Sequence, residues 1–290
     1  MGIWKSSMAE YLTVGITGAN GFLGRSLVKS LRMKGYSIAE FTTKPQNQTQ
    51  IGTDFSDINS MKKHFLKLDL LIHAAWTPSS RTDRQNAELQ NLNRVIGKNV
   101  ADAANDASVK KIIGVGSQDE LETSSKPWRD NEPFAPQSHY SEAKMATYNY
   151  FINSTDELLW VRLFSIYGAT DPRDWIVMSA LKAIKKEETL NVGACDQLFS
   201  LTHVDDAANG FYYLIKNSIL GTVNVSTLET VTLRNSLELL EKVSGNRGLI
   251  RFGKNVDKRN QIRVSGELER LGWTPQISRE QGFRDLLESD

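Results

Sequence analysis

The feature that most constrains the fold of this chain is a glycine-rich turn between an apolar run and an amphipathic one. Residues 12–17 have the apolar, β-branched character of a buried strand, and residues 22–34 carry apolar side chains at helical spacing. The turn that joins them places glycines at Gly18, Gly21 and Gly24. A strand, a glycine turn and a helix in this order predict the first unit of a parallel α/β fold.

Each glycine of this turn has its own physical role. Gly18 lets the chain turn tightly, Gly21 lets the backbone approach a pyrophosphate, and Gly24 lets the helix pack closely on the sheet. The first turn of the helix adds N–H groups without helical partners and the positive end of the helix dipole, which both favour an anion. The predicted cofactor-binding residues of the turn are Gly18, Asn20, Gly21, Phe22, Leu23 and Gly24.

The first half of the chain repeats this alternation of short apolar runs with longer amphipathic ones. Further strands are expected at residues 36–42, 68–74, 111–115 and 158–164, and further helices at 91–105 and 140–152. The alternation predicts a Rossmann-like, doubly wound parallel sheet with helices on both faces and a site at the carboxyl ends of its strands. After Gly168 the alternation weakens, although residues 175–185 and 204–216 have helical spacing. We therefore expect a dinucleotide-binding domain over residues 8–168 and a smaller, partly interleaved substrate-binding lobe over residues 169–290.

Composition argues against several classes of function. Charged residues make up 24% of the chain and the formal net charge is +1, so no global field favours nucleic acid or a membrane surface. No apolar run approaches the roughly 20 residues that a membrane-spanning helix needs. The single cysteine, Cys195, cannot form a disulfide within the chain and fits a reducing compartment, so the cytoplasm is the expected location. No bound metal is expected.

The first seven residues stand apart from the predicted fold. Met1-Gly2 followed by Ser6 matches the loose pattern for N-myristoylation, but no polybasic stretch accompanies it. Met8 shortly precedes the first strand, so residues 1–7 are interpreted as a leader, the stretch before an alternative start, or a remnant added for expression.

The end of the second predicted strand indicates which dinucleotide the chain prefers. Sites for NAD place a carboxylate there for the ribose 2′-hydroxyl, whereas here Thr42 falls at that position and Thr43 and Lys44 follow. Two hydroxyls and a cation could hold a 2′-phosphate, with Arg25 as a second cation. Because Glu40 lies close by, NAD stays open as the alternative to the expected NADP.

A tyrosine and a lysine four residues apart form the candidate catalytic pair. Tyr140 and Lys144 fall on one face of the helix predicted at residues 140–152. A lysine ammonium beside a phenol favours the phenolate, which predicts a phenol pKa below its usual value of about 10. Such a tyrosine can give a proton to a carbonyl oxygen or remove one in the reverse direction. Ser117 follows a buried strand, where its hydroxyl could bind the same oxygen.

Together these residues resemble the extended short-chain dehydrogenase/reductase family of the NAD-dependent epimerase/dehydratase type, and the resemblance covers nearly the whole chain. The motifs that carry it are residues 17–24, Asp54-Phe55, His73-Ala74-Ala75, Asn93, Gly116-Ser117-Gln118, the Tyr140/Lys144 pair, residues 162–168, residues 203–206 and residues 271–275. The resemblance implies an enzyme that moves a hydride with a nicotinamide dinucleotide.

The resemblance also implies a role for each matched residue. Tyr140 would be the acid/base, Lys144 would hold the nicotinamide ribose and tune Tyr140, and Ser117 would bind the reacting oxygen. Asn93 stands at the position of the fourth catalytic-site residue, with helix capping or packing as the alternative. Asp54 and Phe55 would contact adenine, Ala74 and Ala75 would line the cofactor cleft beside the wall residue His73, and Asp205 and Asp206 would begin a helix.

The substrate side departs from the family pattern. Ser165 stands where the family often has an asparagine that touches a sugar, and Phe199 stands where an arginine often binds a nucleotide-sugar phosphate. Phosphate contacts would then fall to Arg173, Arg259 or Arg263, each of which could equally be a surface charge. The substrate-binding candidates are Ser117, Ser165 and Arg173.

The predicted reaction is the NADP(H)-dependent reduction of a keto group on a nucleotide-linked 6-deoxysugar, because nucleotide sugars are the commonest substrates of the family that the chain resembles. The alternative enzyme is an epimerase or dehydratase that retains NAD and returns the hydride to the same molecule. Against a dehydratase, Gln118 stands where the family has an aspartic acid, although Asp119 and Glu120 follow it. A cofactor-sensing protein without chemistry is a further alternative, against which the set of Ser117, Tyr140 and Lys144 argues.

The sequence is compatible with more than one oligomeric state. The helices predicted at residues 91–105 and 140–152 could pair with their copies in a homodimer or could face solvent. Apart from the dinucleotide and a nucleotide sugar, neither a nucleic acid nor a membrane is expected as a partner.

Overall fold

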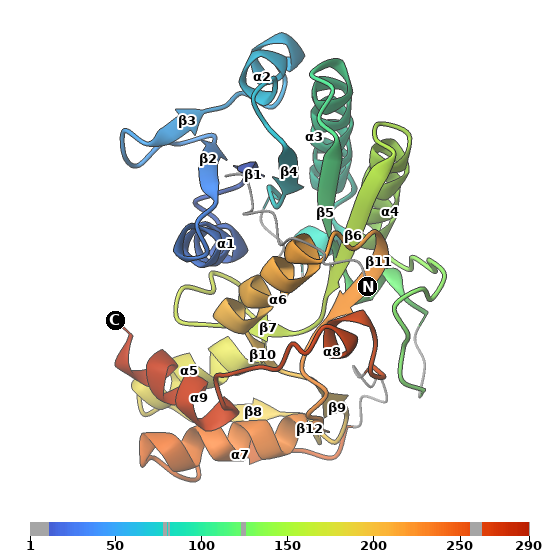
Figure 1. Ribbon diagram of the computed structural model, residues 1–290. Helices are drawn as coiled ribbons and strands as arrows, with labels where there is room; N and C mark the ends of the chain where they lie inside the picture. The colour runs from blue at the N-terminus through green and yellow to red at the C-terminus, as the bar shows by residue number, and fades with distance from the viewer. Residues whose placement is uncertain (1–11, 78–79, 81, 123–125, 256–262, 290) are drawn as a thin grey trace, which may run out of the picture.

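The computed structural model describes residues 12–77, 80, 82–122, 126–255 and 263–289. Residues 1–7 and Arg259, both singled out above, lie outside these described residues. The centre of the fold is a sheet of seven parallel strands (Figure 1). From one edge to the other, its strands are β11 (Gly221–Val225), β6 (Glu157–Leu163), β5 (Lys111–Ser117), β4 (Leu70–His73), β1 (Thr13–Thr17), β2 (Ser37–Thr42) and β3 (Gln50–Gly52).

The order of the strands creates a crevice at one place on the sheet. From β1 the chain adds β2 and β3 on one side, and then it returns to add β4, β5 and β6 on the other. In open parallel sheets, ligands bind at the carboxyl ends of the strands where the order reverses. In this chain the reversal lies between the ends of β1 and β4, at Thr17 and His73. The predicted Rossmann-like, doubly wound sheet is confirmed.

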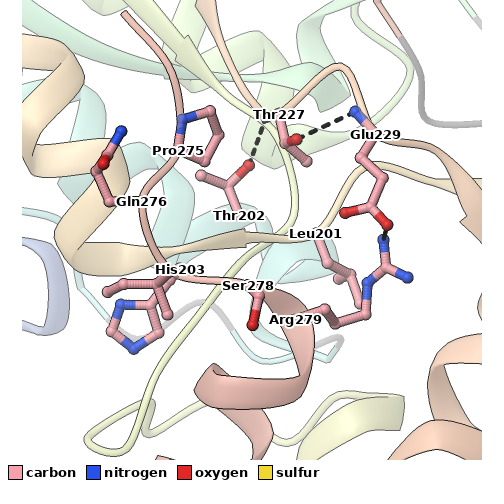
Figure 2. Close-up of a pocket in the computed structure, with 10 residues that line it drawn as sticks. Leu201, Thr202, His203, Thr227, Glu229, Pro275, Gln276, Ser278 and Arg279 are labelled. Atoms are coloured by element: carbon pink, nitrogen blue, oxygen red, sulfur yellow. Dashed lines mark hydrogen bonds and ion pairs between the residues drawn. The ribbon is translucent and has the colours of Figure 1, made fainter.

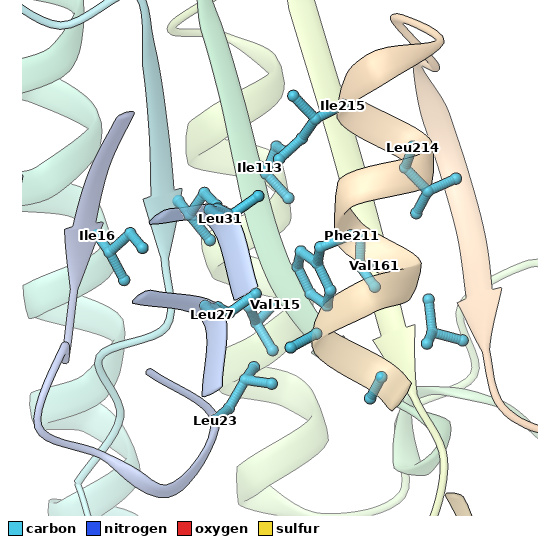
Figure 3. Packing of buried hydrophobic residues seen from close by; sticks show 14 of the residues in the cluster. Ile16, Leu23, Leu27, Leu31, Ile113, Val115, Val161, Phe211, Leu214 and Ile215 are labelled. Carbon is cyan, nitrogen blue, oxygen red and sulfur yellow. The ribbon is translucent and has the colours of Figure 1, made fainter. Parts of the chain in front are cut away.

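Helices cover both faces of the sheet: α1 (Phe22–Met33) and α6 (Val204–Lys216) on one face, and α2 (Ile58–Phe65), α3 (Ala87–Asp106) and α4 (His139–Ile152) on the other (Figure 1). They do so because successive residues of a strand point to opposite faces, and both faces are apolar here. On β5, Ile113 packs with Leu27 of α1 and Phe211 of α6 in one core (Figure 3). Its neighbour Ile112 belongs to the second core, with Val100 of α3.

The predicted helices and strands of this half lie close to their observed bounds. The helix predicted at residues 91–105 begins earlier, at Ala87, because the Asn86 side chain caps it by accepting the N–H of Leu89. The short elements β3 and α2 were not predicted. Residues 50–52 are too few to show an alternating pattern, and α2 has only two buried residues.

Two glycines of β5 make room for a tryptophan of the neighbouring strand. A Cβ on Gly114 or on Gly116 would overlap the indole of Trp160, which is fully buried on β6. A Cβ on Gly116 would also lie 2.7 Å from the carboxylate of Glu120. The absence of side chains here therefore lets a bulky aromatic residue and a buried acid meet below the end of β5.

Residues after 168 build most of a second, smaller assembly. Its core includes Val177, Leu237 and Phe283, and its elements are α5 (Ile176–Lys185), α7 (Leu233–Ser244), α9 (Arg279–Glu288), β8 (Leu190–Val192) and β13 (Ile250–Phe252). The chain also returns to the main sheet, where α6 covers one face and β11 forms the edge strand. The remaining elements are β7 (Ile166–Tyr167), β9 (Leu198–Phe199), β10 (Thr202–His203), β12 (Val231–Thr232), α8 (Glu267–Arg270), and the 3-10 turns η1 (Asp83–Gln85) and η2 (Gln118–Glu120). Within the described residues, no helix is both long and apolar enough to cross a membrane.

One loop carboxylate ties distant parts of the sequence together. The two oxygens of Asp130 accept the N–H of Asn224 on β11 and the N–H of Glu267 at the start of α8, each at 2.8 Å. Next to it, the Nη1 of Arg162 on β6 donates to the carbonyl of Glu132 at 2.8 Å. The loop that follows β5 is thus held by groups from β6, β11 and α8.

Candidate active site

The glycine turn closes against the loop that follows β4. Gly18 has a φ of +71°, which disfavours other residues, and a Cβ there would lie 2.7 Å from the backbone of Ala75. A Cβ on Gly24 would overlap the carbonyl oxygen of Gly18. The turn is closed by a 2.8 Å hydrogen bond from the N–H of Gly21 to the Gly18 carbonyl. Gly18 and Gly24 therefore have the conformational and packing roles that the sequence predicted.

The amino end of α1 is built to receive an anion. Its N-cap, Gly21, offers no side-chain cap, and no acid stands in the first turn. A Cβ on Gly21 would meet only the Gly18 carbonyl within 4 Å, so this face of the turn has room for a ligand that a side chain would fill. The first N–H groups of the helix, beginning at Phe22, have no partner within the helix. This arrangement fits the pyrophosphate of a dinucleotide.

The end of β2 lies beside the glycine turn, as the cofactor prediction requires. The Nδ2 of Asn20 donates to Thr42 Oγ1 at 3.1 Å and to the Lys44 carbonyl at 2.8 Å, while the side chains of Thr43 and Lys44 are exposed. Glu40, the nearby acid, is buried in a 2.5 Å ion pair with Arg32. Its carboxylate is therefore engaged with α1 rather than held out for a ribose hydroxyl.

The remaining predicted cofactor contacts are Asp54 and Phe55, which follow β3, and Ala74 and Ala75, which follow β4. Phe55 is buried in the core under α2 and α3, whereas Asp54 is exposed and accepts the N–H of Ser56 at 2.8 Å. Ala74 and Ala75 donate their N–H groups to the carbonyl and hydroxyl of Thr17, at 3.2 and 3.3 Å. The two alanines therefore hold the β4 loop against the end of β1, at the crevice.

Ser117, Tyr140 and Lys144 come together at the carboxyl end of β5. Ser117 is the last residue of that strand, and α4 begins with a capping box between Ser138 and Ser141, which places Tyr140 in its first turn. All three predicted catalytic side chains are buried, at 7%, 7% and 4% exposure. Hydrogen bonding from the Ser117 side chain lowers the pKa of Tyr140. Two hydroxyl groups thus lie side by side, as binding one reacting oxygen would require.

The amine of Lys144 is enclosed by backbone and aromatic groups. It donates to the carbonyl of Val115 at 2.7 Å and lies 3.6 Å from the ring centroid of Trp76. Burial lowers the pKa of Lys144 to about 7, against the attraction of Glu120 and with a further lowering by Arg84. The lysine is therefore only partly charged near neutral pH.

The expectation that a lysine lowers the pKa of Tyr140 is wrong for this structure. Burial raises the pKa of Tyr140 above its usual value, and the strongest opposing influence is the positive charge of Arg84. The Arg84 guanidinium lies 4.8 Å from the Tyr140 ring centroid, while the amine of Lys144 lies 5.7 Å from it. The sequence pattern showed the helical spacing of the pair but not how deeply it is buried.

Sequence reasoning missed Trp76 and Arg84 of this site, and it noted Glu120 only as an acid that follows Asp119. Trp76 packs edge-on against Tyr140 with ring centroids 5.7 Å apart. Arg84, in η1, forms a 2.5 Å ion pair with Asp119. Glu120, in η2, accepts the N–H of Ser117 at 2.7 Å and completes a capping box with it. The serine and the acid three residues later were a readable signal for Glu120, whereas no local pattern marks Arg84 or Trp76.

Glu120 is the centre of a buried polar network beneath Ser117. Its Oε2 accepts from the indole N–H of Trp160 at 2.8 Å and from the Nε of Arg162 at 3.2 Å. Glu120 is fully buried, and Arg162 is 1% exposed. Burial raises the pKa of Glu120, while Trp160, Arg162 and Lys144 oppose that rise. The network fixes the backbone of Ser117 at the end of β5.

Asn93 has a clear structural engagement. Its Oδ1 accepts both the N–H and the hydroxyl of Thr77 at 2.9 Å, and its Nδ2 donates to Gln90 at 3.1 Å. The side chain is 1% exposed and holds the segment that follows Trp76. The packing alternative describes these contacts, and a catalytic role for Asn93 stays a prediction.

The substrate-side candidates lie in different settings. Ser165 is buried just after β6, where Gln118 donates to its hydroxyl at 3.5 Å. Arg173 is held by Asp171 at 2.6 Å, with its guanidinium 5.3 Å from the ring centroid of Phe22 in the glycine turn. Arg263 is buried and paired with Glu269, so neither proposed role, phosphate ligand or surface charge, describes it.

His73 is a buried wall residue, as predicted. Its Nδ1 lies 2.9 Å from the hydroxyl of Thr17, and its ring packs edge-on against Phe151. Burial, reinforced by the charge of Lys144, lowers the pKa of His73 to about 3. The imidazole is therefore neutral at physiological pH and joins the end of β4 to the end of β1.

A cavity of about 240 Å³ lies away from these residues, between β10 and the start of α9 (Figure 2). His203, Thr227 and Gln276 are among its lining residues. Across it, Arg279 meets Glu229 in a 3.2 Å ion pair. None of Ser117, Tyr140 and Lys144 lines this cavity.

Comparison with known proteins agrees with this geometry. The model of the NAD dependent epimerase/dehydratase family matches residues 14–226. The chain belongs to this family, whose members are NAD(P)-dependent enzymes of the extended short-chain dehydrogenase/reductase type. The predicted family and the prediction of an enzyme are confirmed.

Individual relatives match over almost their whole length. CDP-abequose synthase of Salmonella muenchen is 22% identical over 94% of this chain and 96% of its own. GDP-L-fucose synthase 1 of Arabidopsis thaliana is 24% identical over 94% and 91%. A solved structure of UDP-glucose 4-epimerase of Thermus thermophilus in complex with NAD is 18% identical, covers 96% of this chain and 98% of its own, and has a TM-score of 0.80. The last likeness shows a shared fold.

Proposed function

We propose that this chain is an NADP(H)-dependent oxidoreductase that reduces a keto group on a nucleotide-linked 6-deoxysugar. The observation that carries the proposal is the buried pair of hydroxyls of Ser117 and Tyr140, next to the crevice where the glycine turn fits a dinucleotide. The names of the relatives support the substrate class, because CDP-abequose and GDP-L-fucose are both nucleotide sugars.

In this mechanism the two hydroxyls act on one substrate oxygen. The bound dinucleotide supplies the hydride that reduces the carbonyl carbon. Tyr140 gives the proton from its Oη to the carbonyl oxygen, and Ser117 donates a hydrogen bond that stabilises the negative charge developing there. The raised pKa of Tyr140 keeps the phenol protonated at neutral pH, which is the form that reduction consumes. Lys144 holds the nicotinamide ribose in this proposal, with Trp76 excluding water beside it.

Two features of the β2 end support NADP over NAD. Thr42 replaces a carboxylate, and the exposed Thr43 and Lys44 could bind a 2′-phosphate together with Arg25. Glu40 is engaged with Arg32, so it does not supply the missing acid. The alternative of an NAD-retaining dehydratase requires a basic carboxylate beside Ser117. Asp119 is paired with Arg84, so its carboxylate is already engaged by a cation.

The proposal also covers the division of the chain into two parts, its oligomeric state and its location. Residues 8–168 would bind the dinucleotide, and residues 169–290 would bind the sugar nucleotide, with Ser165 and Arg173 among the contacts. A homodimer would cover the exposed apolar residues of the outer helices, which are Leu92 and Val95 on α3 and Ile152 on α4. The proposed location is the cytoplasm.

The test is a panel of 4-keto nucleotide sugars assayed with NADPH and with NADH. Stoichiometric loss of NADPH and a product that has gained two hydrogens by mass spectrometry are expected. Loss of water from an unoxidised sugar nucleotide without added cofactor would identify a dehydratase. Conversion without net cofactor loss would identify an epimerase. Binding of the dinucleotide without any conversion would identify a sensor.

A further inference from the structure

Arg84 is placed where it can act on the proposed proton donor. Its guanidinium lies 4.8 Å from the ring centroid of Tyr140 and forms a 2.5 Å ion pair with Asp119, which follows Ser117 by two residues. Both members of the ion pair are about one third exposed, so they line the site rather than the core. A cation and an anion thus face the same phenol from η1 and from η2.

The position of Arg84 is fixed by the turn that carries it. The Nε2 of Gln90 donates to the carbonyl of Asp83 at 2.9 Å, and Gln90 is itself held by Asn93 from the same helix, α3. Asp83 also accepts the N–H of Ser80 at 2.9 Å. The η1 turn is therefore tied to α3 by buried amides, which orient the guanidinium over the ring.

Arg84 is also the more constant of the two cations near the phenol. A guanidinium stays charged over the whole physiological range. The pKa of Lys144, about 7, leaves its amine only partly charged there, and that amine is bound to the Val115 carbonyl. Arg84 is therefore the nearer of the two cations to the Tyr140 ring, and it keeps its charge across the physiological range.

The charged and polar groups that face Tyr140 divide into two sets. Arg84 and the hydrogen bond from Ser117 favour the phenolate, whereas Asp119 and Glu120 in η2 oppose it. Lys144 lies farther along α4. Asp171 also bears on the balance, through its attraction for Arg84. When Tyr140 gives its proton to a substrate oxygen, the negative charge left on the phenol would be attracted by the guanidinium, which lies 4.8 Å from the ring centroid.

We propose that Arg84 is a positioning residue that governs proton release from Tyr140, with Asp119 as its opposing partner. The inference deepens the proposed function, because it rests on Tyr140 as the proton donor. It adds Arg84, on η1, to the cations that lie near the Tyr140 ring, beside Lys144 on the same helix as the tyrosine.

The test measures the ionisation of residue 140 directly. A ring-fluorinated tyrosine in place of Tyr140 brings the phenol into an accessible pH range, and its absorbance is titrated in the full chain. Arg84→Met is expected to raise the phenol pKa by about one unit, and Arg84→Lys is expected to restore part of the difference. Asp119→Asn is expected to lower that pKa. Opposite shifts from the two partners are what an electrostatic role requires and a structural role does not.

A matched control uses another cation over a tyrosine. Lys34 lies 4.8 Å from the ring centroid of Tyr212, at the opposite end of α1 from the glycine turn. Lys34→Met is expected to leave the titration of residue 140 unchanged. Equal titration curves in Arg84→Met and the unsubstituted arginine, or shifts of the same sign in Arg84→Met and Asp119→Asn, would overturn the proposal. If Arg84→Met does not fold, Arg84→Lys and Asp119→Asn carry the same test.

The outcome is separable from that of the proposed function, because the titration needs neither dinucleotide nor sugar. Failure of every keto sugar nucleotide to turn over would refute the proposed reaction while the shifts at residue 140 still supported the role of Arg84. Turnover with unchanged titration curves would do the reverse. With a substrate in hand, Arg84→Met should also move the pH profile of the oxidation direction upward by the same shift.

Discussion

The two sides of the candidate site differ in which parts of the chain form them: main chain on one side and side chains from distant segments on the other. The dinucleotide side consists of backbone and of glycines that are neighbours in the sequence, at the end of β1 and the start of α1. The side proposed for proton transfer combines the hydroxyls of Ser117 and Tyr140 with charged side chains that the fold brings together from η1, η2, α4 and β6. The first side is a local conformation, and the second exists only once distant segments have packed.

The amino ends of two helices make the same contrast. The amino end of α1 leaves its N–H groups uncapped, so it can bind an anion through the main chain. The amino end of α4 is capped by Ser138 and Ser141, so its main chain is satisfied within the protein. On α4 the side chains alone, chiefly Tyr140 and Lys144, are available for chemistry.

The largest expected effect is a loss of folding stability when the buried ion pair of Glu120 and Arg162 is broken. Glu120→Gln would leave Arg162 as a buried charge without its partner, which costs about 4 kcal/mol of unfolding free energy. The exposed pair of Lys98 and Asp102 is the control, since Asp102→Asn should cost little where water already solvates both charges. Urea unfolding of both variants makes the measurement. Equal losses of unfolding free energy in the two variants would mean that the buried network contributes no more to stability than an exposed ion pair.

The next effect separates chemistry from cofactor binding. Tyr140→Phe is expected to lower kcat by at least ~100-fold, because it removes the proposed general acid. The affinity for NADPH should change by no more than a few-fold, since the glycine turn is untouched. Steady-state reduction of a keto nucleotide sugar and a fluorescence titration of NADPH measure the two quantities. Near-normal turnover would remove Tyr140 from the mechanism.

A smaller effect is expected on the pH dependence of stability, through the buried His73 at the end of β4. The pKa of His73 is about 3 in the folded chain and about 6.5 when unfolded, so the unfolded chain binds more protons between these values. Stability should therefore fall as the pH drops, by about 2 kcal/mol between pH 6 and pH 4.5 from this residue alone. His73→Gln should flatten that slope in urea unfolding at the two pH values. An unchanged slope would show that His73 is protonated without cost.

The smallest effect concerns the dinucleotide side alone. Lys44→Glu is expected to shift the preference from NADPH toward NADH by about tenfold, because it replaces attraction for a 2′-phosphate with repulsion. Lys242→Glu, at an exposed position of α7, carries the same charge change and should leave the preference unaltered. Competition titrations of the two dinucleotides decide the point. Tighter binding of NADH than of NADPH by the unsubstituted chain would contradict the choice of cofactor.

How far the sequence could predict the molecule follows from the same contrast. The glycine turn, the first strands and the Tyr140/Lys144 spacing depend on contiguous residues, and their elements were placed within a few positions. Glu120 had a local signal in its serine cap, which went unused. Arg84 had none, because its place depends on amides of α3 that hold the η1 turn. The direction of the Tyr140 pKa was also inaccessible, since burial is a property of the packed fold.

The two hydrogen bonds that Asp130 accepts, from Asn224 and Glu267, have a consequence for folding during synthesis on the ribosome. Ser117, Tyr140 and Lys144 all leave the ribosome in the first half of synthesis, but the second oxygen of Asp130 waits for Glu267, which lies 137 residues farther on. Until then the loop between Ser117 and Tyr140 lacks its last anchor. A copy cut short before Glu267 would carry the three side chains proposed for the chemistry without the contact that holds the loop between them.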